Sequence, residues 1–452
     1  MIKVTYKFVI CNYYLFSSWE KEEKPMITLG LDIGTTTVSA VAVEQGRVVE
    51  SITKAHNSFL NGPEWERAQD VAVLRDTALA LVDTLCQKYP VERIGITGQQ
   101  HGIVYLDALG NPLSPLYTWQ DGRGNLPWED GTYASVLSRR TGYAVSAGFG
   151  LVTHFYNLQK GLVPEGAAVI STVHDYVAMV LCGLTRPVTE PSDAQSLGFY
   201  NLEQDAFDRR ALDSMGMDAA ILPQVVRKAF VGKTGEGIPV AVPIGDNPAS
   251  FLGATDGADA VLLNMGTGSQ ISVHTQALAR VPGLETRPYP LGGFLQVGAA
   301  LCGGRAWAMT ERFFSDAVYA FTGQRLALYE KLDWLLDTIP EGSQPQVETT
   351  FDGTRAEPHK RASVQGLSRE NFTAGHLALG VLHGMIDELH CLYDAYLQSG
   401  NASKQLLIGS GNGLRKNRHL RRIAGETFGL PFKMSEQNEE AALGAALFAA
   451  ML

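Results

Sequence analysis

Residues 26–43 are Met-Ile-Thr-Leu-Gly-Leu-Asp-Ile-Gly-Thr-Thr-Thr-Val-Ser-Ala-Val-Ala-Val. An apolar run ends at Asp32, a polar turn with Gly34, Thr35 and Thr36 follows, and a second apolar run completes the stretch. Two apolar runs joined by a glycine-containing polar turn are typical of a β-hairpin. Backbone N–H groups and hydroxyls in such a turn suit phosphate oxygens, and a carboxylate suits Mg²⁺. The alternative is an ordinary hairpin with a polar tip.

The same pattern returns in residues 260–273, Ala-Val-Leu-Leu-Asn-Met-Gly-Thr-Gly-Ser-Gln-Ile-Ser-Val. Aligning Asn264 with Asp32 places Gly266, Thr267 and Gly268 in the second turn. A repeated supersecondary pattern indicates an internal duplication. Two such turns from two domains predict a nucleotide held in the cleft between them.

The order of elements after each hairpin supports the duplication. In each half a helical stretch leads to an apolar strand followed by G-x-x-x-G, at residues 98–102 and at residues 409–413. The sequence therefore predicts two similar α/β domains that face each other. We place an N-terminal extension at 1–25, the first domain at 26–250 and the second at 251–452.

The two turns differ in charge. Asp32 carries a carboxylate, whereas its counterpart Asn264 is neutral. Mg²⁺ needs only one or two carboxylates, and a second acid beside a triphosphate would repel it. We therefore expect Asp32 to serve the metal, and the turn from Gly266 to Ser269 to serve the phosphates alone.

Two further stretches suit a sugar. Trp119–Arg123 combines an aromatic ring, an amide, an acid and a base, a mixture that can line a pocket for a ring with hydroxyls. An apolar stretch, 238–244, ends at Gly245-Asp246, which places a carboxylate at a strand end. The alternatives are a surface loop with an incidental ion pair and an Asp that only begins a turn before Asn-Pro.

Composition excludes some classes of protein. The 452 residues leave room for two domains, and 45% hydrophobic residues with 19% charged residues are a normal globular balance. The formal net charge is −10 with no stripe of Lys and Arg, so we expect no nucleic-acid partner. The five cysteines are widely spaced without C-x-x-C, which fits a reducing, cytoplasmic setting.

The first residues do not match the rest. The stretch 8–16 is apolar but short and interrupted, so we favour a non-native or misassigned start over a signal peptide, with Met26 as the expected initiator. No other stretch is long and apolar enough to span a membrane.

Taken together, these motifs resemble the FGGY family of carbohydrate kinases, within the actin-like, ribonuclease H-like ATPase superfamily. The resemblance runs from about Met26 to the C-terminus. It is carried by residues 32–36, 99–102, 119–123, 245–246, 266–268, 409–413 and 439–446.

The resemblance implies ATP-dependent phosphorylation of a sugar hydroxyl, with an N-terminal sugar-binding and catalytic domain and a C-terminal nucleotide-binding domain. By analogy Asp246 is the general base and Asp32 places Mg²⁺. The ATP-binding positions are Gly34, Thr35, Thr36, Gly266, Thr267, Gly268, Gly409, Gly411 and Asn412. The sugar-binding positions are Gln100, His101, Trp119, Asp121 and Arg123.

Within the family, Trp119–Arg123, Ser146–Gly150 and Gly411–Asn417 look most like kinases of sedoheptulose, and kinases of xylulose are the alternative. Gln100 departs from the family pattern, in which Met is usual before the His. A different class remains open: a nucleotide-driven switch of the actin or chaperone type, which would leave Trp119–Arg123 and Asp246 without a role. A homodimer is possible.

Overall fold

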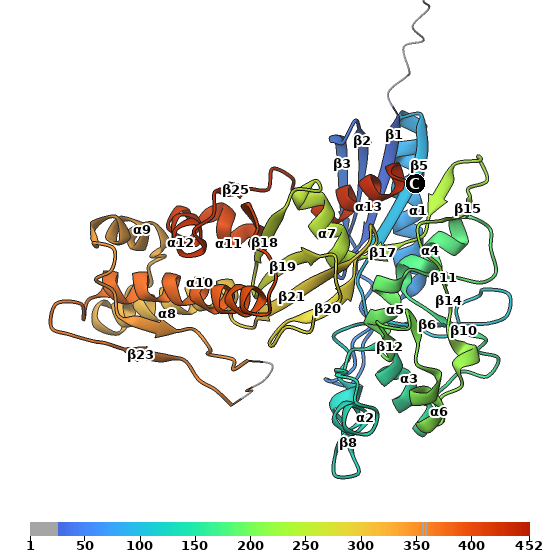
Figure 1. Cartoon of the computed structure of the whole chain (residues 1–452), viewed down its shortest axis with the longest axis horizontal. Coiled ribbons are helices and arrows are strands. Elements are labelled where there is room, and N and C mark those ends of the chain that lie inside the picture. Colours follow the sequence, from blue (N-terminus) through green and yellow to red (C-terminus); the bar gives the residue numbers. More distant parts are fainter. Residues whose placement is uncertain (1–25, 355–356, 358) are drawn as a thin grey trace, which may run out of the picture.

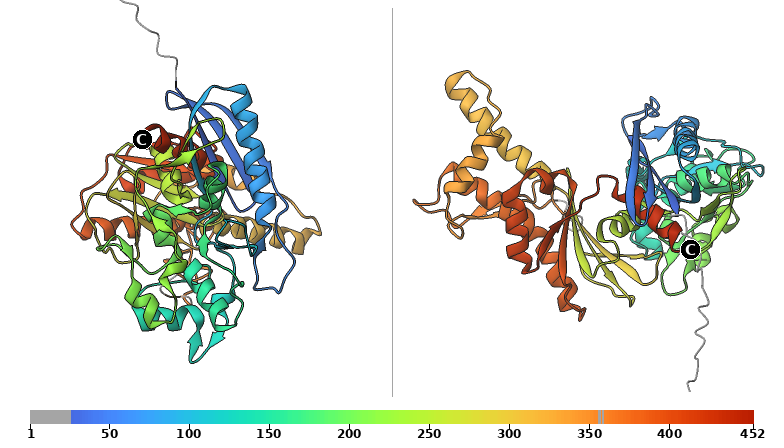
Figure 2. Two further views of the ribbon diagram at one scale, coloured as in Figure 1. Left: turned by 90° about the vertical axis from the view of Figure 1, so that its right-hand side faces the viewer. Right: turned by 90° about the horizontal axis from the view of Figure 1, so that it is seen from above.

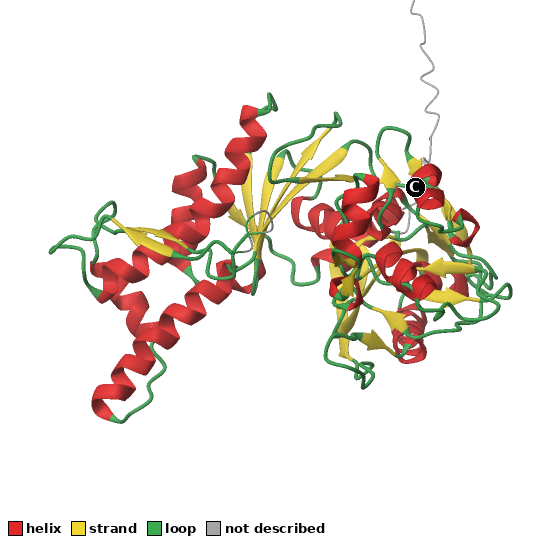
Figure 3. Cartoon of the chain, turned by 90° about the horizontal axis from the view of Figure 1, so that it is seen from below, coloured by secondary structure: helices red, strands yellow, loops and turns green. Residues whose placement is uncertain are grey.

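The computed structural model describes residues 26–354, 357 and 359–452, so the predicted extension at 1–25 lies outside the described residues. The chain forms two α/β parts that lie side by side, one coloured blue to green and the other yellow to red in Figure 1. Figure 2 shows the same two parts from the side and from above. Each part has a central sheet with helices against it (Figure 3).

The sheet of the first part begins with the predicted hairpin. Strands β1 (Ile27–Ile33) and β2 (Thr37–Glu44) pair antiparallel, and β5 (Val91–Gly98) lies parallel to β1 on its other side. The order is β15-β16-β5-β1-β2-β3, and β17 also pairs with β5. The remaining strands are β3 (Arg47–Ala55), β15 (Phe230–Lys233), β16 (Pro239–Ala241) and β17 (Ile244–Gly245).

The sheet of the second part repeats this arrangement. Strands β18 (Ala260–Met265) and β19 (Ser269–Thr275) pair antiparallel, and β24 (Leu406–Ser410) lies parallel to β18. The order is β20-β21-β19-β18-β24-β25, completed by β20 (Glu285–Pro288), β21 (Phe294–Ala300) and β25 (Phe432–Met434). The predicted duplication is confirmed, and both G-x-x-x-G stretches begin at the end of the strand parallel to the hairpin.

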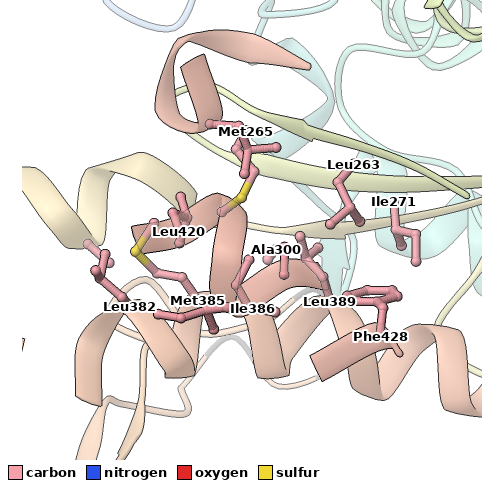
Figure 4. Packing of buried hydrophobic residues seen from close by; sticks show 14 of the residues in the cluster. Leu263, Met265, Ile271, Ala300, Leu382, Met385, Ile386, Leu389, Leu420 and Phe428 are labelled. Carbon is pink, nitrogen blue, oxygen red and sulfur yellow. The ribbon is translucent and has the colours of Figure 1, made fainter. Parts of the chain in front are cut away.

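Helices bury one face of each sheet. Helix α1 (Val71–Lys88) starts at Asp70, whose carboxylate accepts from the N–H groups of Ala72 and Val73. In the second part the long helix α10 (Ala374–Gln398) starts at Thr373 in the same way. Figure 4 shows α10 side chains packed against the second sheet. The labelled residues are Leu263, Met265, Ile271, Ala300, Leu382, Met385, Ile386, Leu389, Leu420 and Phe428.

Two helices join the parts. Helix α7 (Asp246–Thr255) leads from the first sheet to β18, so the domain boundary predicted after residue 250 falls inside it. Helix α13 (Glu440–Ala450) returns to the first sheet, where a Cβ on Gly30 or Gly95 would lie 1.9 Å from a carbonyl oxygen of the helix. Only glycine allows this close approach.

Shorter elements fill the connections. Between β3 and β16 lie β4 (Ala68–Gln69), β6 (Val104–Leu106), β7 (Leu116–Tyr117), β8 (Pro127–Trp128), β9 (Gly131–Thr132), α2 (Tyr133–Thr141), α3 (Gly150–Gln159), β10 (Val169–Ser171), α4 (Val173–Leu181), β11 (Val188–Thr189), α5 (Pro191–Leu197), β12 (Tyr200–Asn201), β13 (Ala206–Phe207), α6 (Arg209–Ser214) and β14 (Gln224–Val225). The second part adds α8 (Gly303–Thr322), α9 (Tyr329–Thr338), β22 (Gln346–Glu348), β23 (Ser363–Gln365), α11 (Gly411–Lys416) and α12 (Arg418–Phe428).

One local prediction is wrong in its extent. The sequence predicts a turn over residues 409–413, but β24 continues to Ser410 and α11 begins at Gly411. Gly411 has a φ of 84°, and a Cβ there would lie 2.6 Å from the carbonyl oxygen of Met265. A glycine in this left-handed region lets the chain pass from strand to helix without a longer turn.

Candidate active site

A cavity of about 420 Å³ lies between the two parts. Its volume falls in the range of small-molecule sites. The first part contributes Asp32, Gly34, Thr35, Gln99, Gln100, His101, Trp119, Asp246, Asn247 and Ser250, and helix α13, which joins the two parts, contributes Ala441. The second part contributes Leu262, Asn264, Gln270, Ser272 and Arg287. Residues predicted for the metal, the base and the sugar therefore meet at one cavity.

The first turn is fixed by its neighbours. The N–H of Gly34 donates to the carbonyl oxygen of Thr37 at 3.0 Å, which closes the turn. The side chain of Gln69 donates to the carbonyl oxygen of Thr35 at 2.8 Å, and the indole of Trp119 donates to the Thr35 hydroxyl at 3.0 Å. Trp119 therefore covers the turn, whereas Thr36 is exposed and is not among the lining residues.

Asp32 stands in an environment that favours a cation. Its Oδ1 is buried and has no hydrogen-bond partner among the described residues. Burial, followed by the charges of Asp246 and Glu439, raises the pKa of Asp32 to about 7. A divalent cation would reverse this shift and satisfy the free oxygen. The residues present thus fit a magnesium ion at Asp32.

Asp246 begins α7 directly after β17, which aims its carboxylate at the cavity. Burial raises the pKa of Asp246, while the positive charge of Arg287 opposes the rise. The backbone N–H groups of Asn247 and Gln100 also favour its charged form. A carboxylate with a raised pKa is suited to accept a proton.

Gln100 and His101 follow the end of β5. His101 has a φ of 72°, its ring stacks on Phe149 at 4.5 Å, and its Nδ1 lies 2.7 Å from the carbonyl oxygen of Ser196. Gln100 is buried and packs closely on Gly245. A Cβ on Gly245 would lie 2.0 Å from the side-chain amide nitrogen of Gln100. Gln100 thus packs against the residue before Asp246, and His101 lines the same cavity.

Asp121 and Arg123 do not line the cavity. They form a buried ion pair of 2.7 Å with each other, and both are almost inaccessible to solvent. Asp121 also accepts from the N–H of Arg67, and Arg123 lies over the ring of Tyr117 at 4.0 Å. The pair therefore braces the loop that carries Trp119, and a direct contact with a sugar stays a prediction.

The second turn is exposed and is backed by a helix. The N–H of Gly304 donates to the carbonyl oxygen of Gly266, and the N–H of Arg305 donates to that of Thr267, both at 3.0 Å. The N-terminus of α8 thus meets the turn, and helix N-termini favour anions. We missed this contribution from the sequence, although the pair Gly303-Gly304 after a strand was a signal for it.

The other predicted nucleotide positions lie beside the same turn. Gly411, at the start of α11, approaches the carbonyl of Met265, and Gly413 approaches it as well. Asn412 is exposed between them, whereas Gly409 is buried. The structure therefore gathers Gly266–Gly268, Gly411 and Asn412 on one edge of the second sheet.

Arg287 is a second residue that we missed. It lies on β20 of the second part, yet its guanidinium donates to the side-chain oxygen of Gln100 in the first part at 3.3 Å. Among the described lining residues it alone carries a permanent positive charge. Two charged residues in a short strand, Glu285 and Arg287, give no sequence signal of a contact with the first part.

Comparisons with known proteins agree with this geometry. The models for the N-terminal and C-terminal domains of the FGGY family of carbohydrate kinases match residues 27–253 and 261–452. The chain belongs to this family. It is an ATP-dependent carbohydrate kinase, and the suspected family is confirmed.

Curated relatives of this chain include a sedoheptulokinase and a xylulose kinase. A sedoheptulokinase from Mus musculus is 27% identical over 93% of this chain and 96% of its own length. A xylulose kinase from Streptomyces coelicolor is 30% identical over 95% of this chain and 88% of its own length.

The fold agrees with solved members of the family. The structure of a xylulose kinase from Rhodospirillum rubrum superposes with a TM-score of 0.80 at 21% identity, over 94% of this chain and 90% of that one. The predicted fold class, duplicated actin-like ATPase domains, is confirmed. No helix in the described part of this FGGY kinase is long and apolar enough to cross a membrane.

Proposed function

We propose that this kinase phosphorylates sedoheptulose to sedoheptulose 7-phosphate. The observation that carries the choice of sugar is the likeness to a sedoheptulokinase over 96% of that protein's length, against 88% for the xylulose kinase. The sequence motifs at Trp119–Arg123 and Ser146–Gly150 point the same way.

Asp246 is the proposed general base. Its carboxylate orients the acceptor hydroxyl and takes up the proton as the oxygen attacks the γ-phosphorus of ATP. Phosphoryl transfer depends on positioning and charge more than on covalent chemistry. A half-buried carboxylate at a helix start meets this requirement, because neither its backbone nor its direction must change during the reaction.

The sugar is positioned by the residues around the base. Gln100 and His101 offer polar groups at the end of β5, and Trp119 offers a ring beside the first turn. Asp121 and Arg123 act in this proposal by holding the loop of Trp119. The sugar ring would stack on the indole while its hydroxyls bond to the polar side chains.

The phosphates are proposed to lie between the two turns. The exposed turn Gly266–Gly268, backed by the start of α8, would hold one side of the triphosphate, and Gly34 and Thr35 at the cavity would hold the other. Asp32 would hold Mg²⁺, which neutralises phosphate charge when bound. Gly411 and Asn412 would then lie next to the nucleoside.

Xylulose is the alternative acceptor, since the xylulose kinase relative is the more identical of the two at 30%. A nucleotide switch without sugar chemistry is less well supported, because it assigns no role to Asp246 or to the braced loop of Trp119.

The test is ATP consumption and product mass with sedoheptulose, xylulose, glycerol, gluconate and no sugar. We expect the highest kcat/KM with sedoheptulose and a monophosphorylated product. A higher kcat/KM with xylulose would overturn the choice of sugar. ATP hydrolysis that is independent of every sugar would contradict this proposal as a whole.

A further inference from the structure

A chain of buried polar groups leads away from the base into the first part. His174 on α4 lies with Nε2 3.0 Å from Oδ2 of Asp193 on α5, and neither side chain is accessible to solvent. The other carboxylate oxygen, Oδ1, accepts from the amide nitrogen of Gln100 at 3.4 Å. Asp193 thus connects a buried histidine to a residue of the cavity.

The amide of Gln100 has one favourable orientation. Its Nε2 faces two acceptors, the carbonyl oxygen of Ser192 at 2.9 Å and Oδ1 of Asp193. Its Oε1 faces a donor, the guanidinium of Arg287, at 3.3 Å. The reversed amide would set oxygen against two acceptors and N–H against a cation, so the protein around it determines which end faces the second part.

Arg287 reaches this amide from the opposite side of the cavity. It is held on its own strand by Glu285 at 2.8 Å, and Glu285 in turn accepts from the side chain of Gln195 on α5 at 3.1 Å. Strand β20 is therefore bonded to the first part at two points. The charge of Arg287 favours the ionised form of Asp246.

We propose that His174 and Asp193 are positioning residues for phosphoryl transfer. They orient Gln100 so that it holds Arg287 of the second part beside Asp246. Because this chain of contacts crosses the cavity, the position of the Arg287 charge next to Asp246 depends on the position of the second part relative to the first. This inference rests on the proposed role of Asp246 in the kinase reaction.

Asp193→Asn offers a near-isosteric test of the chain. Asparagine keeps the size of Asp193 but removes its charge and replaces one carboxylate oxygen by an NH2 group, so either the contact with His174 or the bond from Gln100 must change. The amide of Gln100 then loses one of its two acceptors, which weakens the orientation in which it accepts from Arg287. Arg287→Gln removes the far end of the same chain directly.

The experiment is a double-mutant cycle on kcat with the preferred sugar, using Asp193→Asn, Arg287→Gln and the double variant. Each single variant should lower kcat by about tenfold or more, since a bond to a charged group is lost. The double variant should be no slower than the slower single variant, because both changes act through one chain. An unchanged KM for ATP and an unchanged Tm would show that each variant is folded.

Two controls match these changes. Asp205→Asn removes an exposed ion pair within the first part, and Arg280→Gln removes an exposed ion pair with Glu203 of the first part; both should leave kcat unchanged. If Asp193→Asn does not fold, Gln100→Leu replaces it in the cycle with the same expectation. Losses that multiply in the double variant, or an unchanged kcat in either single variant, would overturn the inference.

A metal ion is the competing explanation for the same residues. His174, Asp175 and Asp193 are buried with ligand atoms within 4.8 Å of one another. A stoichiometric transition metal in the purified wild-type enzyme that is lost in Asp193→Asn would overturn the positioning role. Failure of the proposed function is distinguishable, since the wild-type enzyme would then phosphorylate no sugar.

Discussion

The two hairpin turns share a backbone pattern but not an environment. The first turn contains Asp32, whose carboxylate is close to two other acids and has a raised pKa. The second contains Asn264 and is backed by the N-terminus of α8 through two hydrogen bonds to Gly266 and Thr267. The first turn therefore contains a carboxylate, whereas the second is uncharged and lies at the N-terminus of a helix.

This difference shows how a duplicated unit can divide one task. A phosphate chain with its metal needs a carboxylate on the metal side and donors on the phosphate side. Two identical turns would supply either too many acids or none. The proposed base, Asp246, adds a further asymmetry, because it follows a strand of the first part.

The largest effect should come from removing that asymmetric base. We expect Asp246→Asn to lower kcat by about 10²–10⁴-fold, the range for loss of a general base, while ATP still binds. Steady-state kinetics and calorimetric titration of ATP measure the two quantities. Asp256→Asn, at the exposed far end of α7 with a φ of 48°, is a control that should keep full activity. An active Asp246→Asn enzyme would refute the assignment of the base.

The next effect should come from making the first turn like the second. Asp32→Asn removes the carboxylate proposed for Mg²⁺, and we expect kcat to fall by roughly 10²-fold, because metal ligation contributes several kcal/mol of charge stabilisation. The dependence of rate on Mg²⁺ concentration is the measurement. An unchanged Mg²⁺ dependence would place the metal elsewhere.

The reverse exchange should have a smaller effect. Asn264→Asp places a carboxylate at the second turn, which is proposed to bind the phosphates of ATP. We expect the KM for ATP to rise by roughly fivefold, because repulsion between this exposed carboxylate and a phosphate costs about 1 kcal/mol. Gln324→Glu adds the same charge at an exposed position of the second part and is the control. Equal KM values for both variants would mean that the two turns are interchangeable.

The smallest expected effect concerns stability rather than rate. Burial raises the pKa of Glu190 from its ordinary value of 4.5 to about 8. The folded protein therefore holds a proton that the unfolded chain releases, and this contribution is full below pH 4.5 and lost as the pH rises through 8.

Glu190→Gln imitates the protonated acid and should lose less stability between pH 5 and pH 8. One unit of pKa corresponds to about 1.4 kcal/mol, and we expect a difference of at least this size from denaturant unfolding at the two pH values. Glu203→Gln, in an exposed pair, is the control. Parallel losses in the wild type and Glu190→Gln would show that Glu190 is ionised in the fold.

Local patterns predicted much of this molecule. The alternation of apolar strand and polar turn predicted both hairpins, and their repetition predicted the two sheets, because strand formation depends on neighbours in the chain. The polar strand ends predicted Asp32, Gln100 and Asp246 at the cavity, since parallel strands end at one edge of a sheet.

Contacts between distant segments could not be predicted in the same way. The composition of Trp119–Arg123 suggested a pocket, but the acid and base in it pair with each other inside the protein. The bond from Arg287 to Gln100 joins residues 187 positions apart. Such pairs are set by how the two parts pack, and a single sequence contains no periodicity that reports this packing.

The most direct test of the division between the turns is calorimetric titration of ATP with and without Mg²⁺. In the wild-type enzyme Mg²⁺ should tighten ATP binding, and in Asp32→Asn this gain should be lost while the affinity without Mg²⁺ is unchanged. The same gain from Mg²⁺ in both proteins would contradict the account.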